Sequence, residues 1–364
     1  MKLISWFKAK NNQRLSIQRK ISYSLLKKLI KPKKHKNLNI KEVHSICIWC
    51  YEGIGDAIFI SGFINKLQEL GMEITICSSP RNVNFCKTVL KLEHCYSVNE
   101  LSKITNHFDL IFVAKDNIQY REGKQLLKIF KKAKVKYIVG FDDPLDLYDI
   151  SIKYAENNHI TKKFEYVLDY LWGGANNLIY KLHLSNIIEK QVIDFIYNFK
   201  NKIIVCLNAF AGDNQRSFTV YQVEKITRYL SRYKEIVVIM IGSQEQMKVL
   251  SFVNQDNVLL TPPNLGTISH ALAFIKHADL VITPDTSIVH IANAFNKNMI
   301  CVYNNKKSVT GLDCNIIYGP NYSNCVQLFT KDNLGTTDGD PVSDYDVSEI
   351  FPYIKKFLTD KEDN

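Results

Sequence analysis

Residues 43–70 read VHSICIWCYEGIGDAIFISGFINKLQEL. The first eight residues form an apolar run of strand length, and a glycine-rich turn follows them. From Asp56 onward, apolar residues recur at three- and four-residue steps until Gly71, which is typical of a helix that ends at a glycine. A strand, a tight turn and a helix in this order open a doubly wound α/β sheet. We therefore predict a strand over 43–50 and a helix over 56–70.

The same alternation of strands and helices runs to residue 141 and restarts at residue 202, after a mostly helical, polar stretch. Such alternation predicts parallel sheets that are covered by helices on both faces. We predict a basic helical arm (1–41), two Rossmann-like doubly wound domains facing a cleft (42–198 and 199–330), and a tail (331–364) that packs back toward the first domain. The other expected strands are 73–79, 108–115, 135–141, 202–210, 235–243, 257–261, 279–285 and 298–304.

The formal net charge of +11 is unevenly distributed. Residues 1–41 hold 13 Lys and Arg and no Asp or Glu, which leaves 34 of the 47 basic residues against 36 acidic residues in the remainder. The body is therefore nearly neutral, and this argues against a basic cleft that binds nucleic acid. With 364 residues, 46% of them apolar, the chain is long enough for two hydrophobic cores.

The nine cysteines are scattered through apolar runs. Cys47 and Cys50 form a lone C-x-x-C pair, but residues three apart on a strand point to opposite faces, and no second pair stands at zinc spacing. We expect buried free thiols in a reducing cytoplasm, and no metal site. Asp338 and Asp340, in the sequence DGD, resemble a metal-binding D-x-D motif, but they lie in the tail, where we expect a solvated acidic loop.

The arm carries a basic amphipathic pattern, typical of a helix that lies in an anionic lipid interface. We expect residues 1–36 to bind the anionic inner leaflet of a membrane. The alternative is a helix that packs its apolar residues on the body. No apolar run approaches the roughly 20 residues of a spanning helix, and we see no secretory signal. The apolar positions are Leu15, Ile17, Ile21, Leu25, Leu26, Leu29 and Ile30.

The turn GIGDAI has three interpretations. Gly53 and Gly55 fit the first two glycines of a dinucleotide fingerprint, but the third position is Ile58, and Asp56 would repel a pyrophosphate. Asp56 is also a favourable capping residue for a helix. Finally, a carboxylate that the helix dipole keeps ionised at the mouth of a cleft is suited to accept a proton from a hydroxyl. Position alone leaves the capping and the catalytic interpretations open.

The second half offers an anion site. A predicted strand ends at Asp285, and a helix starts at once, so that Thr286 and Ser287 present hydroxyl and N–H groups to a diphosphate. His290, one turn later, either faces the same site or is a core histidine. Arg216, in the polar loop NAFAGDNQRSFT, suits phosphate oxygens, with a solvated surface arginine as the ordinary alternative.

Together, EGIGDAIFISGFINKL and the later ADLVITPDTSIVHIANAFNKNMICVYN resemble glycosyltransferase family 9, the lipopolysaccharide heptosyltransferases. That family has a Gly-Asp pair in its first loop and an Asp-Thr-Gly-x-x-His junction between a strand and a helix in its second half. Here Ser287 replaces the glycine. Two ordered motifs over roughly residues 43–320 are more specific than either alone.

The resemblance implies a GT-B fold, in which the first half mainly binds the acceptor and the second half binds a nucleotide-activated sugar. It implies that Asp56 is the general base, in a loop with Gly53 and Gly55, and that Arg216 stabilises the departing diphosphate. The residues that it implies for the donor are Asp285, Thr286, Ser287 and His290, with Glu245 as a looser candidate for the ribose hydroxyls.

The implied reaction is an inverting transfer of a heptose from ADP-heptose to a hydroxyl of a lipopolysaccharide or lipooligosaccharide core. It would need no metal or other cofactor, because a cation and a helix end would stabilise the diphosphate. The implied location is the cytoplasmic face of the inner membrane of a Gram-negative bacterium. The alternatives are another nucleotide-sugar donor, another glycan or a protein as acceptor, and a non-catalytic nucleotide-sugar-binding protein. A nicotinamide-dependent oxidoreductase is opposed by the broken fingerprint.

Overall fold

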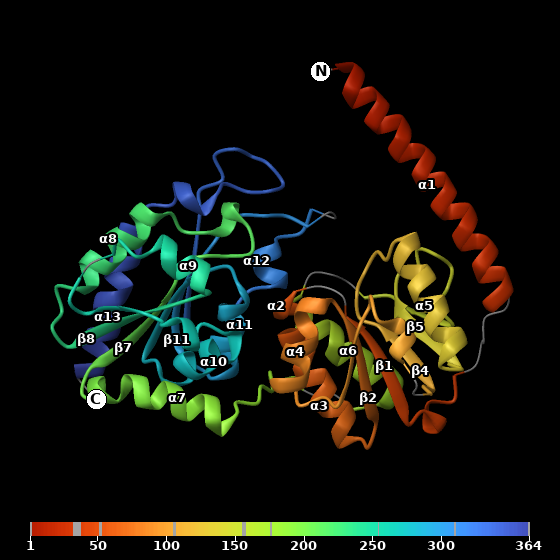
Figure 1. Cartoon of the computed structure of the whole chain (residues 1–364), viewed down its shortest axis with the longest axis horizontal. Helices are drawn as coiled ribbons and strands as arrows, with labels where there is room; N and C mark the ends of the chain where they lie inside the picture. The colour runs from red at the N-terminus through yellow and green to blue at the C-terminus, as the bar shows by residue number, and fades with distance from the viewer. Residues whose placement is uncertain are drawn as a thin grey trace.

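The structure is a computed structural model that describes residues 2–31, 38–50, 53–104, 107–154, 158–174, 177–253, 255–308 and 311–362. Within these residues the chain forms two domains, each built on a six-stranded sheet, and a long helix α1 (Lys2–Ile30) that projects from the first domain (Figure 1). The prediction of two doubly wound α/β domains after a helical arm is confirmed.

The first sheet has the strand order β3-β2-β1-β4-β5-β6, and all of its pairings are parallel. Side chains of β1 alternate between two cores, with Ile46 and Ile48 in one and Cys47 and Trp49 in the other. The strands are β1 (Ser45–Cys50), β2 (Glu73–Ser78), β3 (His94–Ser97), β4 (Leu110–Val113), β5 (Tyr137–Phe141) and β6 (Ile150–Ile152).

The second sheet has the order β12-β11-β10-β7-β8-β9, again with parallel pairing throughout. Counted from its own first strand, this is the same doubly wound order as in the first sheet. The chain therefore reverses its winding direction between β1 and β4, and again between β7 and β10. The strands are β7 (Ile203–Asn208), β8 (Ile236–Ile241), β9 (Val258–Leu260), β10 (Leu280–Pro284), β11 (Asn298–Tyr303) and β12 (Cys325–Phe329).

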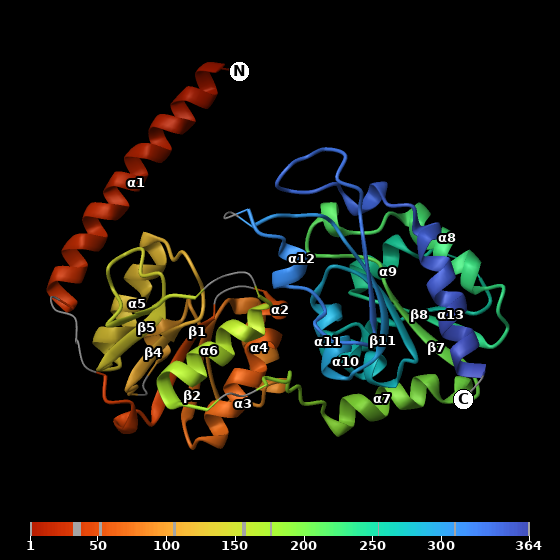
Figure 2. The same ribbon diagram turned by 180° about the vertical axis from the view of Figure 1, so that it is seen from behind.

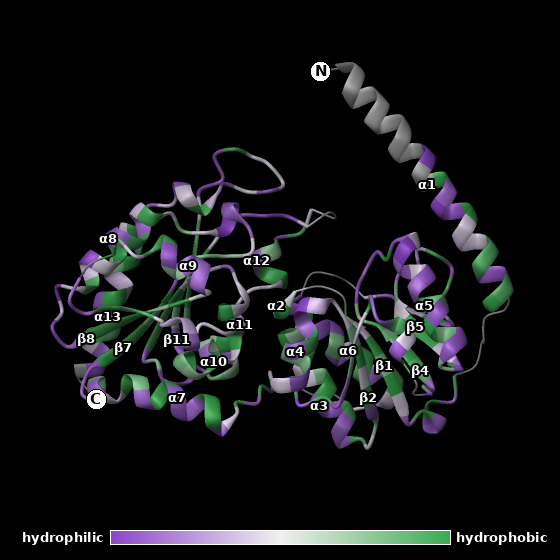
Figure 3. Ribbon diagram, viewed as in Figure 1, coloured by the Kyte–Doolittle hydropathy of each residue, from purple (hydrophilic) through white to green (hydrophobic). Residues whose placement is uncertain are grey.

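Helices flank both sheets, and the apolar strands lie between them (Figures 2 and 3). One core cluster includes Phe63 and Phe112 of the first domain and Cys206 and Val289 of the second, so the hydrophobic core continues across the domain boundary. The helices of the first domain are α2 (Ile54–Phe59), α3 (Ser61–Glu69), α4 (Pro80–Thr88), α5 (Tyr120–Lys132) and α6 (Ile160–Trp172). Those after it are α7 (Asn186–Ile196), α8 (Val220–Leu230), α9 (Gln244–Val249), α10 (Ile268–His277), α11 (Ser287–Ala294), α12 (Cys314–Ile317) and α13 (Phe351–Glu362).

The helix predicted over 56–70 is two helices, α2 and α3, that meet at Ile60. The Ser61 hydroxyl donates to the Ile58 carbonyl at 2.6 Å. A side chain at Gly62 would bring its Cβ within 2.6 Å of the Ile179 carbonyl, so glycine lets the segment between the domains cross α3 closely.

The predicted boundary between residues 198 and 199 is wrong, because α7 already packs on the second domain. Gln191 of α7 hydrogen-bonds His270 of α10 at 3.1 Å, and Glu189 pairs with His277 at 2.8 Å. The second domain therefore begins before α7, after the crossing segment.

The predicted contact of the tail with the first domain is also wrong. Ile350, Ile354 and Leu358 lie in the same core cluster as Val223 and Ile226 of α8, so α13 covers a face of the second sheet. The tail carries apolar residues at helical spacing, and the second sheet supplies the matching uncovered face.

The predicted solvated acidic loop is wrong for Asp340, which is 3% exposed. Its carboxylate accepts the N–H groups of Asn333 and Leu334, at 2.8 and 2.9 Å, and thereby closes the loop on itself.

Among the described residues, no three His, Cys, Asp or Glu side chains are arranged to hold a metal ion. All nine cysteines are free thiols, and Cys47 and Cys50 lie in separate cores, as their spacing predicts.

The end of α1 is anchored to the first domain. Tyr23 is buried against α5, and its hydroxyl donates to the Leu145 carbonyl at 3.0 Å. Lys31, just after the helix, forms a buried ion pair with Asp149 at 2.7 Å. The predicted alternative of packing on the body therefore applies to this end of the arm. Residues 32–36 of the predicted membrane-binding range lie outside the described residues.

Farther out on α1, apolar side chains face solvent. Ile17, Ile21 and Leu25 are 53%, 56% and 60% exposed. In the part of the chain that the structure describes, no helix combines the length and the hydropathy needed to cross a bilayer.

The Lys31–Asp149 pair is expected to carry much of the anchoring. Replacing Lys31 with Met should lower the free energy of unfolding by about 3 kcal/mol, because the Asp149 carboxylate would stay buried without its cation. Lys27→Met is a matched control, since Lys27 pairs at 2.7 Å with an Asp146 side chain that is 78% exposed, and should cost less than about 1 kcal/mol. Urea denaturation measures both values, and equal losses would contradict the anchoring role of Lys31.

Candidate active site

A cavity of about 290 Å³ lies at the point where the first sheet reverses its winding direction. Such switch points are the usual ligand sites of doubly wound sheets, because the loops after the two central strands diverge there. One lining residue, Tyr318, comes from the second domain, so the cavity opens between the domains. The lining residues are Cys50, Asp56, Phe59, Ala114, Lys115, Asp116, Ile160, Phe164 and Tyr318.

Asp56 lines this cavity from the first turn of α2, whose N-cap residue is Gly53, so the expectation that Asp56 itself is the N-cap is wrong. Its Oδ2 accepts the N–H of Gly53, the residue before the helix, at 2.7 Å. This bond to the N-cap residue and a catalytic role are compatible, since the same hydrogen bond fixes the carboxylate at the cavity wall. Its role as a base stays a prediction.

Lys115 and Asp116 in the cavity wall were not predicted as site residues. Lys115 pairs with Glu122 at 3.1 Å, and Asp116 pairs with the buried Lys163, whose ammonium lies 3.8 Å from the centre of the Phe141 ring. These charges are therefore balanced within the first domain. The signal that would have found them is their place directly after β4, next to the switch point.

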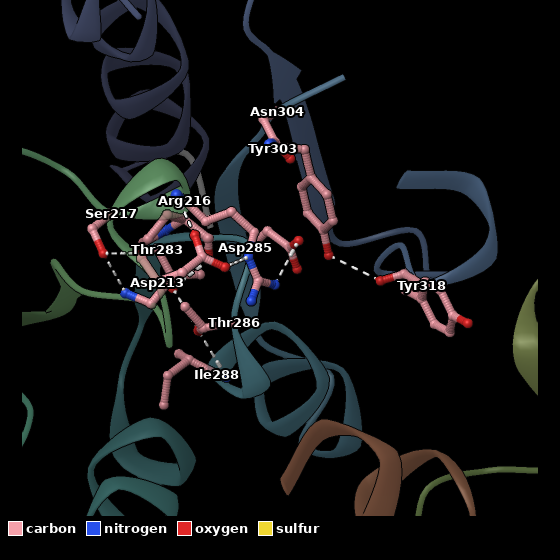
Figure 4. Close-up of polar contacts among 12 residues, drawn as sticks. Asp213, Arg216, Ser217, Thr283, Asp285, Thr286, Ile288, Tyr303, Asn304 and Tyr318 are labelled. Carbon is pink, nitrogen blue, oxygen red and sulfur yellow. Dashed lines mark hydrogen bonds and ion pairs between the residues drawn. The ribbon is translucent and has the colours of Figure 1, made fainter. Parts of the chain in front are cut away.

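The second site lies at the matching switch point of the second sheet, between β7 and β10, and centres on Arg216 (Figure 4). The Arg216 Nε donates to Asp213 at 2.8 Å, and Nη1 donates to Asp285 at 3.1 Å. The loop that carries Arg216 is closed by Ser217, whose hydroxyl donates to the Asp213 carbonyl at 2.8 Å and accepts the Ala211 N–H at 2.9 Å. Arg216 is thus a fixed cation, not a solvated surface arginine, while Asp213 is a site residue that sequence reasoning missed.

The three charged groups, Asp213, Arg216 and Asp285, shift one another's pKa values. Burial raises the pKa of Asp285 above its ordinary value, and Arg216 opposes this shift without cancelling it. Burial also acts to raise the pKa of Asp213, but the hydrogen bonds and the positive charge of Arg216 together outweigh burial and lower that pKa. Because its two carboxylate partners outweigh burial, the pKa of Arg216 is raised, and the guanidinium stays charged.

Thr286 starts α11. Its hydroxyl accepts the Ile288 N–H at 3.1 Å and the Asn208 side-chain amide at 3.2 Å. Asn208, at the end of β7, also bonds the Thr283 hydroxyl at 2.9 Å, so it ties β7 to β10 below the Arg216 cluster. Asn208 was not predicted, although it is a buried polar residue at the end of an apolar strand. The role of Thr286 and Ser287 in diphosphate binding stays a prediction.

His290 lies in the contact between the domains. It is 3% exposed, and its ring centre is 4.3 Å from that of Phe59 in α2. A Cβ at Gly55 would lie 3.6 Å from the His290 ring, so the turn that carries Asp56 rests against α11. His159 adds a second link, since its Nε2 lies 3.1 Å from the Gly319 carbonyl. The structure thus places His290 in the core of the interface, whereas its contact with the donor stays a prediction.

Glu245 stands apart from the Arg216 cluster. It is an exposed residue in the first turn of α9, after β8, on the carboxyl edge of the second sheet. Among the described residues, the ion pairs of Arg216 are with Asp213 and Asp285 and not with Glu245, whose role with the ribose stays a prediction.

Residues 174–323 match the family model of glycosyltransferase family 9 (heptosyltransferase). An Escherichia coli (strain K12) protein named "Putative lipopolysaccharide heptosyltransferase 4" is 22% identical over 288 residues, which cover 76% of this chain and 78% of that protein. The resemblance to glycosyltransferase family 9 is confirmed.

Two solved structures share the fold. The glycosyltransferase family 9 protein of Veillonella parvula superposes with a TM-score of 0.69 at 13% identity, covering 90% of this chain and all of that one. The Escherichia coli ADP-heptose lipopolysaccharide heptosyltransferase II superposes with a TM-score of 0.67 at 12% identity, covering 87% of this chain and 99% of the other. The predicted GT-B fold is confirmed. The family match and the curated relative identify the chain as a heptosyltransferase-like glycosyltransferase.

The geometry of this glycosyltransferase separates two chemical tasks. The first domain presents a carboxylate, Asp56, at a cavity lined by both charged and apolar side chains, where a hydroxyl proton can be accepted. The second presents a fixed guanidinium, Arg216, beside a helix start, where an anion can be bound. The Phe59–His290 contact holds the two together.

The low pKa values of the two interface histidines predict that the glycosyltransferase becomes less stable to unfolding in acid. Burial lowers the pKa of His290 to about 3 and that of His159 to about 4, both below the ordinary value of about 6.5. Between about pH 6.5 and pH 4 the unfolded chain therefore binds more protons than the folded one, so stability falls as the pH falls. Each histidine should contribute a slope of up to about 1.4 kcal/mol per pH unit.

His290→Phe keeps an aromatic ring against Phe59 and should remove one of these slopes. Chemical denaturation at pH 7 and pH 5 is expected to show that the variant loses about 2 kcal/mol less stability over this range than the parent protein. Replacing the exposed His94 with Gln is the control. A pH dependence of His290→Phe equal to that of the parent protein would contradict the assignment.

Proposed function

We propose that this glycosyltransferase moves a heptose from ADP-heptose to a hydroxyl of a lipopolysaccharide or lipooligosaccharide core, with inversion and without a metal. The names of two relatives support this substrate pair, since one is named for lipopolysaccharide and the other for ADP-heptose. The observation that carries the proposal is the placement of Asp56 and Arg216 at the switch points of two sheets whose domains share one interface.

In this proposal, the acceptor hydroxyl enters the cavity and gives its proton to Asp56 as its oxygen attacks the anomeric carbon. The new carbon–oxygen bond forms on the face opposite to the departing diphosphate, which takes the electron pair of the broken bond. General-base help of this kind contributes about 10²- to 10⁴-fold in rate. Apolar and aromatic residues, Phe59 and Phe164 among them, line the cavity and limit the access of water to the reacting carbon.

Arg216 and the first N–H groups of α11 would bind the diphosphate and stabilise the negative charge that grows on it. Asp285 would act mainly through Arg216, because its carboxylate binds the guanidinium at 3.1 Å. Glu245 would reach the ribose from the next loop along the sheet.

We further propose that α1 holds the enzyme on the anionic cytoplasmic face of the inner membrane of a Gram-negative bacterium. Ile17, Ile21 and Leu25 recur every four residues and are more than half exposed, and the basic Arg19 and Lys20 lie beside them in solvent. This combination suits a helix that inserts its apolar stripe among lipid headgroups. The helix projects from the body, so its stripe is accessible to a flat surface (Figure 1).

The base assignment predicts the behaviour of Asp56→Asn. With ADP-heptose and a deacylated lipopolysaccharide core as substrates, the variant should transfer at least about 100-fold more slowly, because an amide cannot accept the proton. Its affinity for ADP should stay within about 2-fold of the parent value, since the nucleotide is expected on the second domain. Asp194→Asn is the control for the loss of one charge, since Asp194 is an exposed carboxylate that pairs with Lys190 on α7.

Parent-like turnover of Asp56→Asn would remove Asp56 as the base. Release of a nucleoside diphosphate only from other nucleotide sugars would keep the reaction and change the donor. A panel that includes GDP- and UDP-sugars separates these results.

The membrane assignment predicts the behaviour of a triple variant with Gln at positions Ile17, Ile21 and Leu25. Its co-sedimentation with vesicles that contain anionic lipid should weaken by roughly 10- to 100-fold, because three apolar side chains are lost from the interface. Ile187→Gln, which changes an apolar side chain of α7 that is 73% exposed, is the control. Unchanged sedimentation of the triple variant would contradict the role of α1, and its activity on a soluble acceptor should remain that of the parent protein.

A further inference from the structure

The Arg216 cluster carries more negative than positive charge. Two carboxylates, Asp213 and Asp285, bind a single guanidinium, at 2.8 and 3.1 Å. A diphosphate that approaches this cluster meets a cation whose charge is already more than balanced. Electrostatic attraction of a further anion therefore needs another positive group nearby.

The loop after β11 reaches the same edge of the sheet. β11 is the direct neighbour of β10, and the Asp285 N–H donates to the Val302 carbonyl of β11 at 3.0 Å. The end of β11, at Tyr303 and Asn304, lies beside Arg216 and Asp285 (Figure 4). Lys306 follows two residues later.

The backbone holds the segment around Lys306 in place. The Lys306 carbonyl accepts the Cys314 N–H at 2.9 Å, and the Lys307 N–H donates to the Thr337 carbonyl at 2.8 Å. The Lys306 residue is exposed. Its ammonium is near enough to the cluster to act with Arg216 in opposing the rise in the pKa of Asp285, of which burial is the main cause.

We propose that Lys306 is a second cation for the diphosphate of the nucleotide-sugar donor, and that Asp213 is the residue that positions Arg216 for the same ligand. This inference rests on the proposed function, because it names the part of the donor that the two cations share. With Lys306 included, the four side chains are neutral in sum, and the helix start of α11 adds its positive end. The flexible stem of lysine lets its ammonium follow the diphosphate, whereas Arg216 is fixed.

Arg216 and Lys306 would contribute to diphosphate binding in different ways. Arg216 is held by two carboxylates and offers a set direction for hydrogen bonds, which fixes the orientation of the diphosphate. Lys306 contributes mainly charge. It should therefore strengthen the binding of diphosphates more than that of monophosphates, and its contribution should fall with increasing salt.

The test compares parent protein, Lys306→Ala, Lys306→Arg and Lys307→Ala by calorimetric titration with ADP, GDP, UDP and AMP in the presence of EDTA. For the diphosphate that the parent binds best, Lys306→Ala should raise Kd by about 10-fold, and Lys306→Arg should recover most of this loss. The matched control Lys307→Ala, one residue along the same loop, should bind as the parent does. The loss in Lys306→Ala should be smaller at 0.5 M salt than at 0.05 M, and smaller for AMP.

Parent-like binding by Lys306→Ala would overturn the inference. Equal losses of affinity in Lys306→Ala and Lys307→Ala would also overturn it, because they would indicate that any positive charge in this loop has the same effect. A parent protein that binds none of the three diphosphates would overturn both the inference and the proposed function. Diphosphate binding that depends on Lys306, together with no transfer from ADP-heptose, would support the inference and overturn only the proposed donor.

For Asp213, the comparison is between Asp213→Asn and Asp213→Ala. Asp213→Asn retains a carbonyl oxygen that can accept from the Arg216 Nε, so it should keep more of the diphosphate affinity than Asp213→Ala. A merely structural role would instead lower the unfolding temperature of both variants while leaving Kd unchanged.

Discussion

The contact between α2 and α11 is the constraint on which the site depends. Each of these helices starts at the carboxyl edge of its own sheet, and each start carries half of the site, with Asp56 on one and Thr286 on the other. Phe59 and His290 close the gap between the helices with ring centres 4.3 Å apart. A shift of this contact would separate the Asp56 part of the site from the Arg216 part, whatever the internal stability of each domain.

The same constraint explains why His290 is buried although no carboxylate among the described residues binds its ring. His290 packs against the rings of Phe59 in the first domain and Tyr180 in the segment between the domains, and burial keeps its imidazole neutral. A neutral imidazole packs as an aromatic side chain, whereas an imidazolium at this place would need solvent or an anion. The low pKa of His290 thus results from the apolar character of the interface. Both favour the Phe59–His290 contact between the domains near neutral pH.

The central strands were predictable because they are buried on both faces and read as continuous apolar runs. The missed strands β3, β6 and β12 all lie at sheet edges, where a strand is short and its side chains are only partly apolar. Sequence periodicity also could not assign α7 or α13 to a domain, because an amphipathic helix shows that it has a partner but not which face it covers.

The site residues likewise divide into those that local sequence reveals and those that only tertiary contacts reveal. Asp56, Arg216 and Asp285 were predictable because they follow strands at two switch points and match a family pattern. Asp213 and Asn208 were missed because their importance arises from the direction of a loop and from a bond between two strands. Asp340 was misjudged for a related reason, since only the closed loop reveals that its carboxylate binds backbone amides.

The anchoring of α1 sets the direction of this helix relative to the first domain. Tyr23 and the Lys31–Asp149 pair fix the end of the helix to α5 and to the loop before β6, so the axis of α1 has a set direction relative to the first sheet. The exposed stripe of Ile17, Ile21 and Leu25 is therefore oriented by the domain whose cavity contains Asp56. In the proposed function, a membrane bound by this stripe would lie in a fixed relation to the Asp56 part of the site, and the interdomain contact would set the place of the Arg216 part. The direction of the stripe relative to Asp56 thus depends on Tyr23 and on the buried Lys31–Asp149 pair at the end of α1.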